Sequence, residues 1–277
     1  MSKKTVQIGD ITCGADTLFL ISGPCVIEEE TVMMRTAEHL KKISEKYNLP
    51  VIYKSSFTKD NRSALNYYHG PGLEEGLKML QKVKDNFGLP LVSDIHEAAH
   101  AAPAAEVLDM LQIPAYLCMQ TSIVKAAADT GKPVNIKHGQ FLAPENMSKP
   151  VRKMIDAGNE QVLLTERGYT FGYNDLIVDP RSFFEMQKTG FPVIFDITHS
   201  IRKYGIPSAD PKGGAREYLP VLTRAGIAAG VDGVFLETHP KPEEALCDAA
   251  SQLSLNDLED FLKPIIEFHE LEVKYRK

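Results

Sequence analysis

Short apolar runs alternate with longer amphipathic segments along almost the whole chain. Eight such runs can be read: LFLISGPC, VIYKSS, LPLVSDIHE, IPAYLCMQ, PVNIKHGQ, QVLLTERG, FPVIFDITHS and VDGVFLETHP. Runs of this length predict buried strands of a parallel sheet. The segments between them carry apolar residues at three- and four-residue spacing, which predicts helices. These helices fall near 29–47, 73–87, 99–110, 122–130, 148–157, 181–189, 215–229 and 256–275.

Strands that alternate with helices in this way predict an α/β fold, a single (β/α)8 TIM barrel over residues 1–277. Two short β-like runs surround Gly9-Asp10 and predict a β-hairpin, so we expect residues 1–16 to cap the bottom of the barrel. Segment 200–214 is polar, rich in glycine and proline, and follows the seventh strand. We expect it to form a mobile lid over the mouth.

Charged or metal-competent residues stand at the C-terminal ends of all the predicted strands but one. In a barrel these ends converge on a single active site. The exception is the fourth run, IPAYLCMQ, which ends at Met119-Gln120. The strand-end residues are Cys25, Lys54, Asp94 with His96, Lys137, Arg167, His199 and Glu237.

Four candidate metal ligands fall close together in this arrangement. Cys25, His199 and Glu237 end the first, seventh and eighth strands, which become neighbours when the barrel closes. Asp248 lies just beyond the eighth strand. A thiolate, an imidazole and two carboxylates suit Zn²⁺, Fe²⁺, Mn²⁺ or Co²⁺. The alternative is that the cysteine only packs and the histidine only hydrogen-bonds, but their common placement favours a divalent metal.

Cationic side chains gather at the same mouth. A buried lysine is costly unless an anion neutralises it. Ion pairs with Asp94, Asp196 or Glu166 would satisfy any one of these cations, but several together favour a bound phosphate or carboxylate. His96 and His138 could equally be acid–base groups or polar lining. The cations are Lys54, Lys59, Arg62, Lys137 and Arg167, with Arg202 or Arg216 in addition.

Composition narrows the class of protein. The chain is 43% hydrophobic and 25% charged, which is ordinary for a globular protein, and its net charge of −6 argues against nucleic-acid binding. No apolar run is long enough to span a membrane, and the N-terminus lacks the apolar stretch of a signal peptide. The four cysteines show no disulfide spacing, so we expect reduced thiols and a cytoplasmic location, with neither nucleic acid nor membrane as a partner.

A series of short motifs runs in order over nearly the whole chain. They are Gly23-Pro24-Cys25-Val26-Ile27-Glu28, Asn61-Arg62-Ser63, Gly70-Pro71-Gly72, Asp94-Ile95-His96-Glu97, Gln120-Thr121, Asn135-Ile136-Lys137, Gly139-Gln140-Phe141, Glu166-Arg167-Gly168, Phe171-Gly172-Tyr173, Asp196-Ile197-Thr198-His199-Ser200 and Glu237-Thr238-His239-Pro240. In these motifs the chain resembles the 3-deoxy-D-manno-octulosonate-8-phosphate synthases. The sister 3-deoxy-D-arabino-heptulosonate-7-phosphate synthases share the barrel and the Gly-Pro-Cys turn. They carry Lys-Pro-Arg-Thr where this chain has Lys59-Asp60-Asn61-Arg62.

The resemblance implies an activity and a metal class. Phosphoenolpyruvate would condense with arabinose 5-phosphate, releasing phosphate and a C8 keto-sugar acid phosphate that is usually destined for lipopolysaccharide. Family members with asparagine after Gly-Pro need no metal, whereas those with cysteine depend on one. Cys25 therefore places the chain in the metal-dependent group, with His199, Glu237 and Asp248 as the other ligands. The resemblance also implies a homotetramer.

The resemblance further assigns roles to individual positions. Lys54, Lys137 and Arg167 match positions that hold phosphoenolpyruvate. Positions that hold the aldose phosphate are matched by Lys59, Asn61, Arg62 and Ser63, and we place Gln140 and Arg202 with the substrate as well. The residues expected at the reacting centre are Lys54, Lys137, Asp94, Asp196 and His199, with the two aspartates and Glu166 orienting their neighbours.

Several departures from the family pattern touch the aldose half. The family has arginine where this chain has Met119, and by resemblance that arginine contacts the aldose phosphate across a subunit interface. Loss of one such contact would weaken binding by roughly 1.5–3 kcal/mol unless another group replaces it. Lys212 or His138 are candidate replacements. The other departures are His69 and Ser122.

Three functions remain open at this point. The first is metal-dependent condensation of phosphoenolpyruvate with arabinose 5-phosphate. The second is the same chemistry on another aldose or aldose phosphate, motivated by Met119, His69 and His138. The third is a barrel that binds phosphoenolpyruvate or a sugar acid without turnover, against which the retained Cys25 and Arg167 argue.

Overall fold

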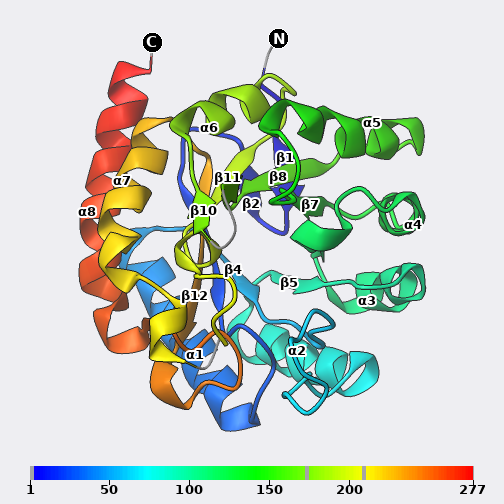
Figure 1. Cartoon of the computed structure of the whole chain (residues 1–277), viewed down its shortest axis with the longest axis vertical. Coiled ribbons are helices and arrows are strands. Elements are labelled where there is room, and N and C mark those ends of the chain that lie inside the picture. Colours follow the sequence, from blue (N-terminus) through cyan, green and yellow to red (C-terminus); the bar gives the residue numbers. More distant parts are fainter. Residues whose placement is uncertain (1–2, 172–174, 208–209, 277) are drawn as a thin grey trace.

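Eight parallel strands form a closed barrel surrounded by helices, as the sequence predicts (Figure 1). The structure is a computed structural model that describes residues 3–171, 175–207 and 210–276. The first barrel strand pairs with the last, and the pairing of β11 with β12 completes the ring. The strands are β3 (Phe19–Gly23), β4 (Val51–Lys54), β5 (Leu91–Asp94), β6 (Met110–Ile113), β7 (Val134–Lys137), β8 (Val162–Glu166), β11 (Val193–Asp196) and β12 (Gly233–His239).

Helices follow the strands at the positions that the amphipathic pattern predicts, with two shifts. The helix expected at 99–110 ends at Val107, and the one expected at 215–229 begins at Leu219 after a 3-10 turn. The helices are α1 (Glu30–Tyr47), α2 (Leu73–Phe87), α3 (Ala101–Val107), α4 (Thr121–Asp129), α5 (Ser148–Asp156), α6 (Pro180–Gln187), α7 (Leu219–Ala228) and α8 (Leu255–Tyr275). None of these described helices is long and apolar enough to cross a membrane.

The prediction for the fourth strand is wrong. The strand is β6 at Met110–Ile113 rather than the run 113–120, and Ala115–Leu117 is a 3-10 turn. The polar residue Gln112 interrupts the apolar pattern of this short strand, so the pattern did not predict it. The Gln112 side chain is nonetheless fully buried. Burial is tolerated because Gln112 donates to Asp94 and accepts from Asn135. Met119 therefore lies in a loop beyond the strand end.

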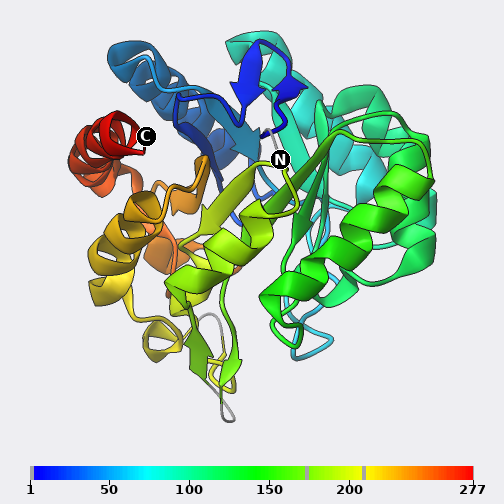
Figure 2. The same cartoon turned by 90° about the horizontal axis from the view of Figure 1, so that it is seen from above.

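The N-terminal hairpin closes one end of the barrel, which confirms the predicted cap. Strand β1 (Val6–Ile8) pairs antiparallel with β2 (Ile11–Cys13). The buried side chains Val6, Ile8 and Cys13 pack in one cluster with residues from inside the barrel strands. Figure 2 shows the hairpin at one end of the barrel. A second hairpin, β9 (Tyr169–Phe171) with β10 (Asp175–Ile177), and the short β13 (Leu253–Ser254) were not predicted.

A glycine shapes the mouth at the end of the first barrel strand. Gly23 has φ +154°, and a Cβ at this position would lie 2.0 Å from the backbone oxygen of Lys54. Real Cβ atoms do not approach so closely, so only glycine allows β3 and β4 to meet here. The Gly-Pro-Cys turn that follows thereby brings Cys25 to the mouth.

Candidate active site

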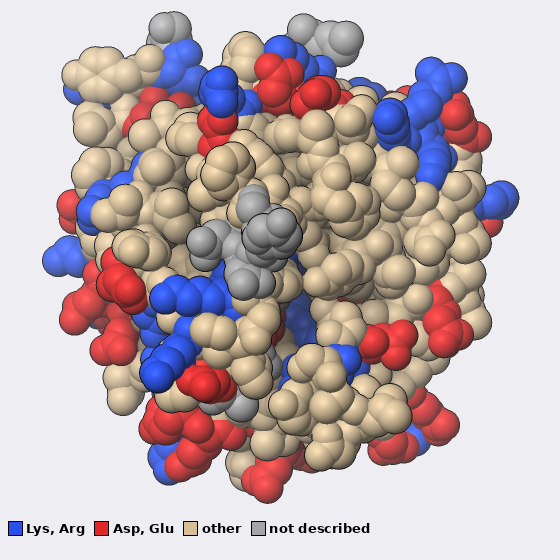
Figure 3. All heavy atoms as spheres, viewed as in Figure 1, with Lys and Arg blue, Asp and Glu red and all other residues tan. Residues whose placement is uncertain are grey.

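A cavity of about 510 Å³ opens at the C-terminal ends of the barrel strands. Figure 3 shows lysine and arginine atoms within a hollow near the centre of this face. The lining brings together the last residues of β5 and β7 and residues from loops that follow the barrel strands. Of the predicted site residues, those that line it are Lys59, Asn61, Arg62, Ser63, Asp94, Lys137, Arg167, His199, Arg202 and Asp248.

The other predicted site residues lie behind this lining. Lys54 is fully buried; its Nζ donates to the backbone oxygen of Cys25 at 3.0 Å and pairs with Glu237 Oε1 at 2.9 Å. The structure therefore holds Lys54 against a candidate metal ligand rather than in the cavity wall. Gln140 is also buried, and its Oε1 accepts from Arg167 at 3.4 Å.

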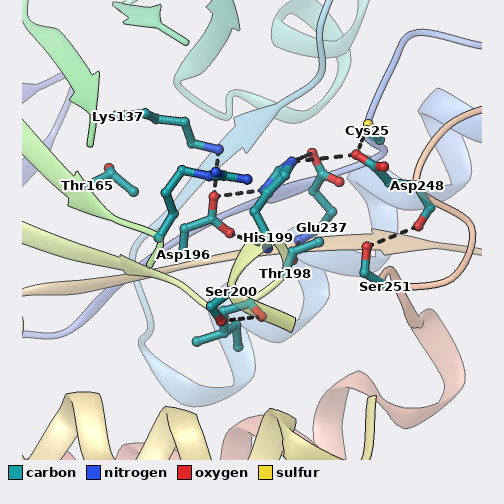
Figure 4. Close-up of polar contacts among 12 residues, drawn as sticks. Cys25, Lys137, Thr165, Asp196, Thr198, His199, Ser200, Glu237, Asp248 and Ser251 are labelled. Carbon is teal, nitrogen blue, oxygen red and sulfur yellow. Dashed lines mark hydrogen bonds and ion pairs between the residues drawn. The ribbon is translucent and has the colours of Figure 1, made fainter. Parts of the chain in front are cut away.

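The four candidate ligands come together at one corner of the mouth (Figure 4). His199 Nε2 lies 3.5 Å from Asp248 Oδ2 and 4.0 Å from Glu237 Oε1. Cys25 Sγ lies 3.3 Å from the same Asp248 oxygen. Two groups of residues that could hold a metal thus share Asp248. One group adds His199 and Glu237, and the other adds Cys25 and Cys247.

The donor set fits a divalent ion. Glu237 Oε2 is buried and has no hydrogen-bond partner among the described residues, as expected of an oxygen that awaits a ligand. Asp248 adopts φ 49°, a conformation uncommon outside glycine that often marks functional sites. Burial would raise the pKa of both carboxyls. Lys54 and His199 nevertheless hold the pKa of Glu237 below its usual value, and His199 and Arg202 hold that of Asp248 well below.

Asp196 orients His199 from behind. Its Oδ2 accepts from His199 Nδ1 at 2.8 Å, and its Oδ1 accepts from the His199 backbone N–H at 2.9 Å. This contact fixes the ring so that Nε2 faces Glu237 and Asp248, as Figure 4 shows. Asp196 Oδ2 also pairs with Lys137 Nζ at 2.6 Å. Burial would raise the pKa of Asp196, but His199 and Lys137 hold it far below its usual range.

Lys137 is a buried cation at the cavity wall. Burial lowers its pKa, and Asp196 opposes that shift. Its Nζ lies 3.8 Å from the centre of the Phe235 ring. An ammonium group in such a poorly hydrated position attracts a substrate anion strongly, because little water competes for its N–H donors.

A chain of hydrogen bonds crosses the barrel interior below the cavity. Thr165 Oγ1 donates to Asn135 Oδ1 at 2.7 Å, and Asn135 Nδ2 donates to Gln112 Oε1 at 2.9 Å. Gln112 Nε2 then donates to Asp94 Oδ1 at 2.6 Å. Lys59 Nζ pairs with Asp94 Oδ2 at 3.2 Å, which draws the β4 loop to the mouth. We call these four residues, Thr165, Asn135, Gln112 and Asp94, the interior chain.

Arg62 is held on three sides. Its Nη1 donates to Cys247 Sγ and its Nη2 donates to the Leu246 backbone oxygen at 3.3 Å, while the guanidinium lies 5.4 Å from the centre of the Tyr67 ring. Its Nε is buried without a partner among the described residues. These contacts hold the Arg62 guanidinium in place at the cavity wall.

Two of the departures from the family pattern have internal roles. His69 binds the backbone oxygens of Lys59 and Leu65, and His138 is fully buried between Glu166 Oε1 at 3.1 Å and the Leu142 backbone oxygen at 2.6 Å. Of the two histidines left open above, His96 lines the cavity and His138 does not. Burial lowers the pKa of His96 against the opposing charge of Asp94.

The remaining departures lie outside the cavity lining. Met119 packs against the core, Ser122 is exposed on α4, and Lys212 is exposed. Neither Lys212 nor His138 thus stands where it could replace a phosphate contact within this chain. Arg216, the alternative to Arg202, hydrogen-bonds the backbone oxygen of Ala249 instead of lining the cavity.

Segment 200–214 supplies part of the cavity wall through Arg202 and residues 204–207. Its mobility stays a prediction, and residues 208–209 lie outside the described part of the chain, as do Gly172 and Tyr173 of the Phe171 motif. Sequence reasoning missed several lining residues, four of which carry a phenol or a thiol. Their signals were weak: Cys247 precedes a candidate ligand, and the three tyrosines stand in loops. They are Tyr67, Tyr116, Tyr204 and Cys247.

Comparison with known proteins shows what the whole chain is similar to. The model of the DAHP synthetase I family matches residues 2–273. A 2-dehydro-3-deoxyphosphooctonate aldolase of Pelobacter propionicus is 51% identical over 256 residues, covering 92% of this chain and 94% of that protein. Proteins of the same name from Trichlorobacter lovleyi (50% over 261 residues, 94% and 96%) and Geotalea daltonii (49% over 263 residues, 95% and 96%) are similar to it as well.

The compound in that name is 3-deoxy-D-manno-octulosonate 8-phosphate in different nomenclature. These relatives therefore confirm the resemblance predicted from the motifs. The family model spans nearly the whole chain, and the relatives do so at about half identity. The chain belongs to the DAHP synthetase I family.

Proposed function

We propose that this protein condenses phosphoenolpyruvate with arabinose 5-phosphate and water, giving 3-deoxy-D-manno-octulosonate 8-phosphate and inorganic phosphate. The observation that carries the proposal is a cavity with buried cations beside a cysteine–histidine–carboxylate cluster. Relatives that are about half identical carry the name of an aldolase for this same C8 acid.

The reaction balances without an oxidant or reductant. The electron pair of the phosphoenolpyruvate C2–C3 double bond forms a new bond from C3 to the aldehyde carbon, and the aldehyde oxygen takes up a proton. Water adds at C2 and loses a proton. The bond between C2 and the phosphate oxygen then breaks, phosphate leaves, and the C2 hydroxyl becomes the ketone as its proton is released.

Lys137 and Arg167 hold phosphoenolpyruvate in this scheme. Both are buried cations that line the cavity from neighbouring strand ends, β7 and β8. They orient the carboxylate and phosphate and stabilise negative charge on the departing phosphate. Lys54 acts one layer behind them, since its ion pair with Glu237 fixes that carboxylate.

The aldose phosphate occupies the opposite half of the cavity. Lys59, Asn61, Arg62 and Ser63 lie on the loop after β4 and line it together. Arg62 is already positioned by Cys247 and by the Tyr67 ring, which reduces the entropy lost on binding a phosphate. The aldehyde end of the sugar then reaches toward His199 and Asp248.

A divalent metal, Zn²⁺, Fe²⁺, Mn²⁺ or Co²⁺, is part of this proposal, with Cys25, His199, Glu237 and Asp248 as its ligands. When bound, such an ion supplies a positive charge that positions and polarises an oxygen of the aldehyde or of water. Asp196 keeps the His199 ring oriented, and Lys54 keeps Glu237 in place. If His199 holds the metal through Nε2, it would not be a free general base.

The decisive experiment measures inorganic phosphate released from phosphoenolpyruvate with a panel of aldoses, with and without EDTA. The panel contains arabinose 5-phosphate, ribose 5-phosphate, erythrose 4-phosphate and free pentoses. We expect fast release with arabinose 5-phosphate and loss of that release in EDTA. Release that survives complete chelation would remove the metal from the mechanism and leave the condensation itself standing.

A different aldose is the second candidate, and Met119 is the observation that favours it. His69 and His138 no longer support it, because both are engaged in contacts within the chain. Release with another aldose only would establish this candidate. The absence of release with every aldose would instead favour a binding protein without turnover.

We further propose one barrel domain per subunit, a homotetramer, a cytoplasmic location and a product destined for lipopolysaccharide. All four cysteines are free, which suits a reducing compartment. Exposed apolar side chains on outer helices, Phe184 on α6 and Leu271 on α8, suit subunit contacts. Light scattering coupled to size-exclusion chromatography tests the assembly, and a monomeric mass would contradict it.

A further inference from the structure

Tyr204 connects the segment after β11 with a cation that we assign to phosphoenolpyruvate. Tyr204 lies between β11 and α7 in the chain and lines the cavity. Its phenolic oxygen accepts a hydrogen bond of 2.7 Å from Arg167 Nη2. The guanidinium also lies 5.9 Å from the centre of the Tyr204 ring. A residue from this segment thus touches the buried arginine directly.

The hydrogen-bonding capacity of the phenol indicates what else it binds. A tyrosine hydroxyl has one O–H donor in addition to its acceptor lone pairs. Arg167 has only donors and uses the acceptor side of Tyr204, so the phenolic proton is left for the neighbouring Tyr116 hydroxyl or for a bound ligand. The two side chains line the same cavity. An anionic oxygen seated beside Arg167 is the partner that would take a hydrogen bond from both.

Arg167 has few other partners to hold it. Its Nη1 donates to Gln140 Oε1 at 3.4 Å, a long contact, and no carboxylate forms a salt bridge with it among the described residues. Although it has few partners, Arg167 is buried, since only 4% of its surface is exposed. A buried guanidinium whose closest partner is a neutral phenol has no directly bonded counter-ion, because Asp196 acts on it only from a distance. The substrate anion would supply that direct partner.

We propose that Tyr204 is a substrate-binding residue that donates its phenolic hydrogen bond to the same anionic oxygen of phosphoenolpyruvate that Arg167 contacts. This inference rests on the proposed function and deepens it, since it names a recognition group for one substrate. Tyr116 stands beside Tyr204 in the lining, and burial together with the charge of Tyr204 raises the pKa of Tyr116.

The test is the dissociation constant for phosphoenolpyruvate alone, measured by isothermal titration calorimetry on the full chain. Tyr204→Phe keeps the ring and removes only the hydroxyl. A hydrogen bond to a charged group corresponds to about a tenfold loss or more, so we expect a dissociation constant raised about tenfold. In turnover, the KM for phosphoenolpyruvate should rise while the KM for the aldose stays the same.

A matched control separates binding from folding. Tyr218→Phe removes a hydroxyl from an exposed tyrosine outside the cavity lining and should leave the dissociation constant unchanged. The thermal midpoint of Tyr204→Phe should fall by only a few degrees, because Arg167 loses one acceptor while the fold persists. If Tyr204→Phe binds phosphoenolpyruvate within about twofold of the native chain, the inference is overturned.

A double-mutant cycle with Arg167→Lys tests whether the two residues act on one oxygen. If they do, the double variant binds only slightly more weakly than Arg167→Lys alone. Losses that multiply would mean two independent contacts and would contradict the shared oxygen. Failure of the proposed function looks different, because the native chain itself would then neither bind phosphoenolpyruvate nor release phosphate.

Discussion

At the residue scale, two buried thiols at opposite ends of the barrel have different roles: one belongs to the candidate site and the other packs in the core. Cys25 stands at the mouth 3.3 Å from Asp248, whereas Cys13 packs in the apolar cluster at the capped end. Burial raises the pKa of both thiols. Only Cys25 has neighbours that could share a metal, and a bound ion would favour its thiolate.

Cys25→Ala should abolish metal retention and turnover while the barrel stays folded, because it deletes one of four ligands and little volume. Metal content by inductively coupled plasma mass spectrometry and phosphate release are the measurements. Cys13→Ala, the matched control, should keep both properties. Full metal content in the Cys25 variant would show that the ligand set is assigned wrongly.

The buried pair of His138 and Glu166 makes stability depend on pH. Burial would raise the pKa of Glu166, but His138 and the Gly168 N–H lower it. A carboxyl with a lowered folded-state pKa stabilises the fold above its unfolded pKa, about 4.3, and that contribution disappears as the pH falls through the folded-state value. We expect Glu166→Gln to reduce the free energy of unfolding by about 1–3 kcal/mol at neutral pH.

Urea unfolding of both proteins between about pH 3.5 and 7 measures this effect. The difference between them should narrow as the pH falls, because glutamine does not titrate. A difference that stays constant over this range would show that the charge of Glu166 contributes nothing.

For individual residues, the sequence predicts which ones gather at the mouth but not which side chain each of them contacts. Strand ends converge in any such barrel, so Lys137, Arg167 and His199 could be placed at one mouth from spacing alone. The contacts of Lys54 with Glu237 and of Tyr204 with Arg167 depend on side-chain directions and on a loop path. No periodicity in the sequence encodes either of these.

At the scale of elements, the contact between β3 and β4 leaves no room for a side chain at Gly23. Gly23→Ala would bring a Cβ to 2.0 Å from the Lys54 backbone oxygen at φ +154°. Backbone would have to move, so we expect a loss of more than about 4 kcal/mol or failure to fold. Soluble yield and the thermal midpoint report this.

Gly88→Ala provides the comparison for that variant. Gly88 ends α2 at φ +64°, and a Cβ there would meet nothing within 4 Å. It therefore incurs only the left-handed backbone strain, about 1–2 kcal/mol. Equal losses in the two variants would mean that close approach at Gly23 is unimportant.

Most elements could be predicted from hydrophobic period, and β6 shows where that reasoning ends. Gln112 interrupts the apolar character of its four residues, so the pattern predicts the strand in the apolar run that follows them. The following apolar residues, Ala115–Leu117, instead form a 3-10 turn. Tertiary hydrogen bonds to Asp94 and Asn135 decide the outcome, and no local pattern reveals them.

For the molecule as a whole, the cap and the cavity lie at opposite ends of one barrel. Ile8 is 1% exposed in the cluster that closes the bottom. Ile8→Ala should reduce the free energy of unfolding by about 2–4 kcal/mol, because it removes buried methyl groups from a closed cluster. Binding of phosphoenolpyruvate should remain unchanged. Denaturant unfolding and calorimetry measure the two effects.

Ile11→Ala is the control for the cap, since Ile11 is only partly buried against the same cluster. It should reduce stability less than Ile8→Ala does. Weakened substrate binding in the Ile8 variant, with the fold intact, would reveal that the two ends of the barrel are energetically coupled.

The interior chain has a consequence for how this barrel can diverge. Each amide in it is oriented by both neighbours, so Thr165, Asn135, Gln112 and Asp94 point in one consistent direction. Replacing one member alone would strand a buried donor on one side and an acceptor on the other. A single substitution in the interior chain therefore destabilises the fold, even where a combined replacement of several members would be stable. In descent, we expect these four positions to be inherited as one unit and exchanged only together.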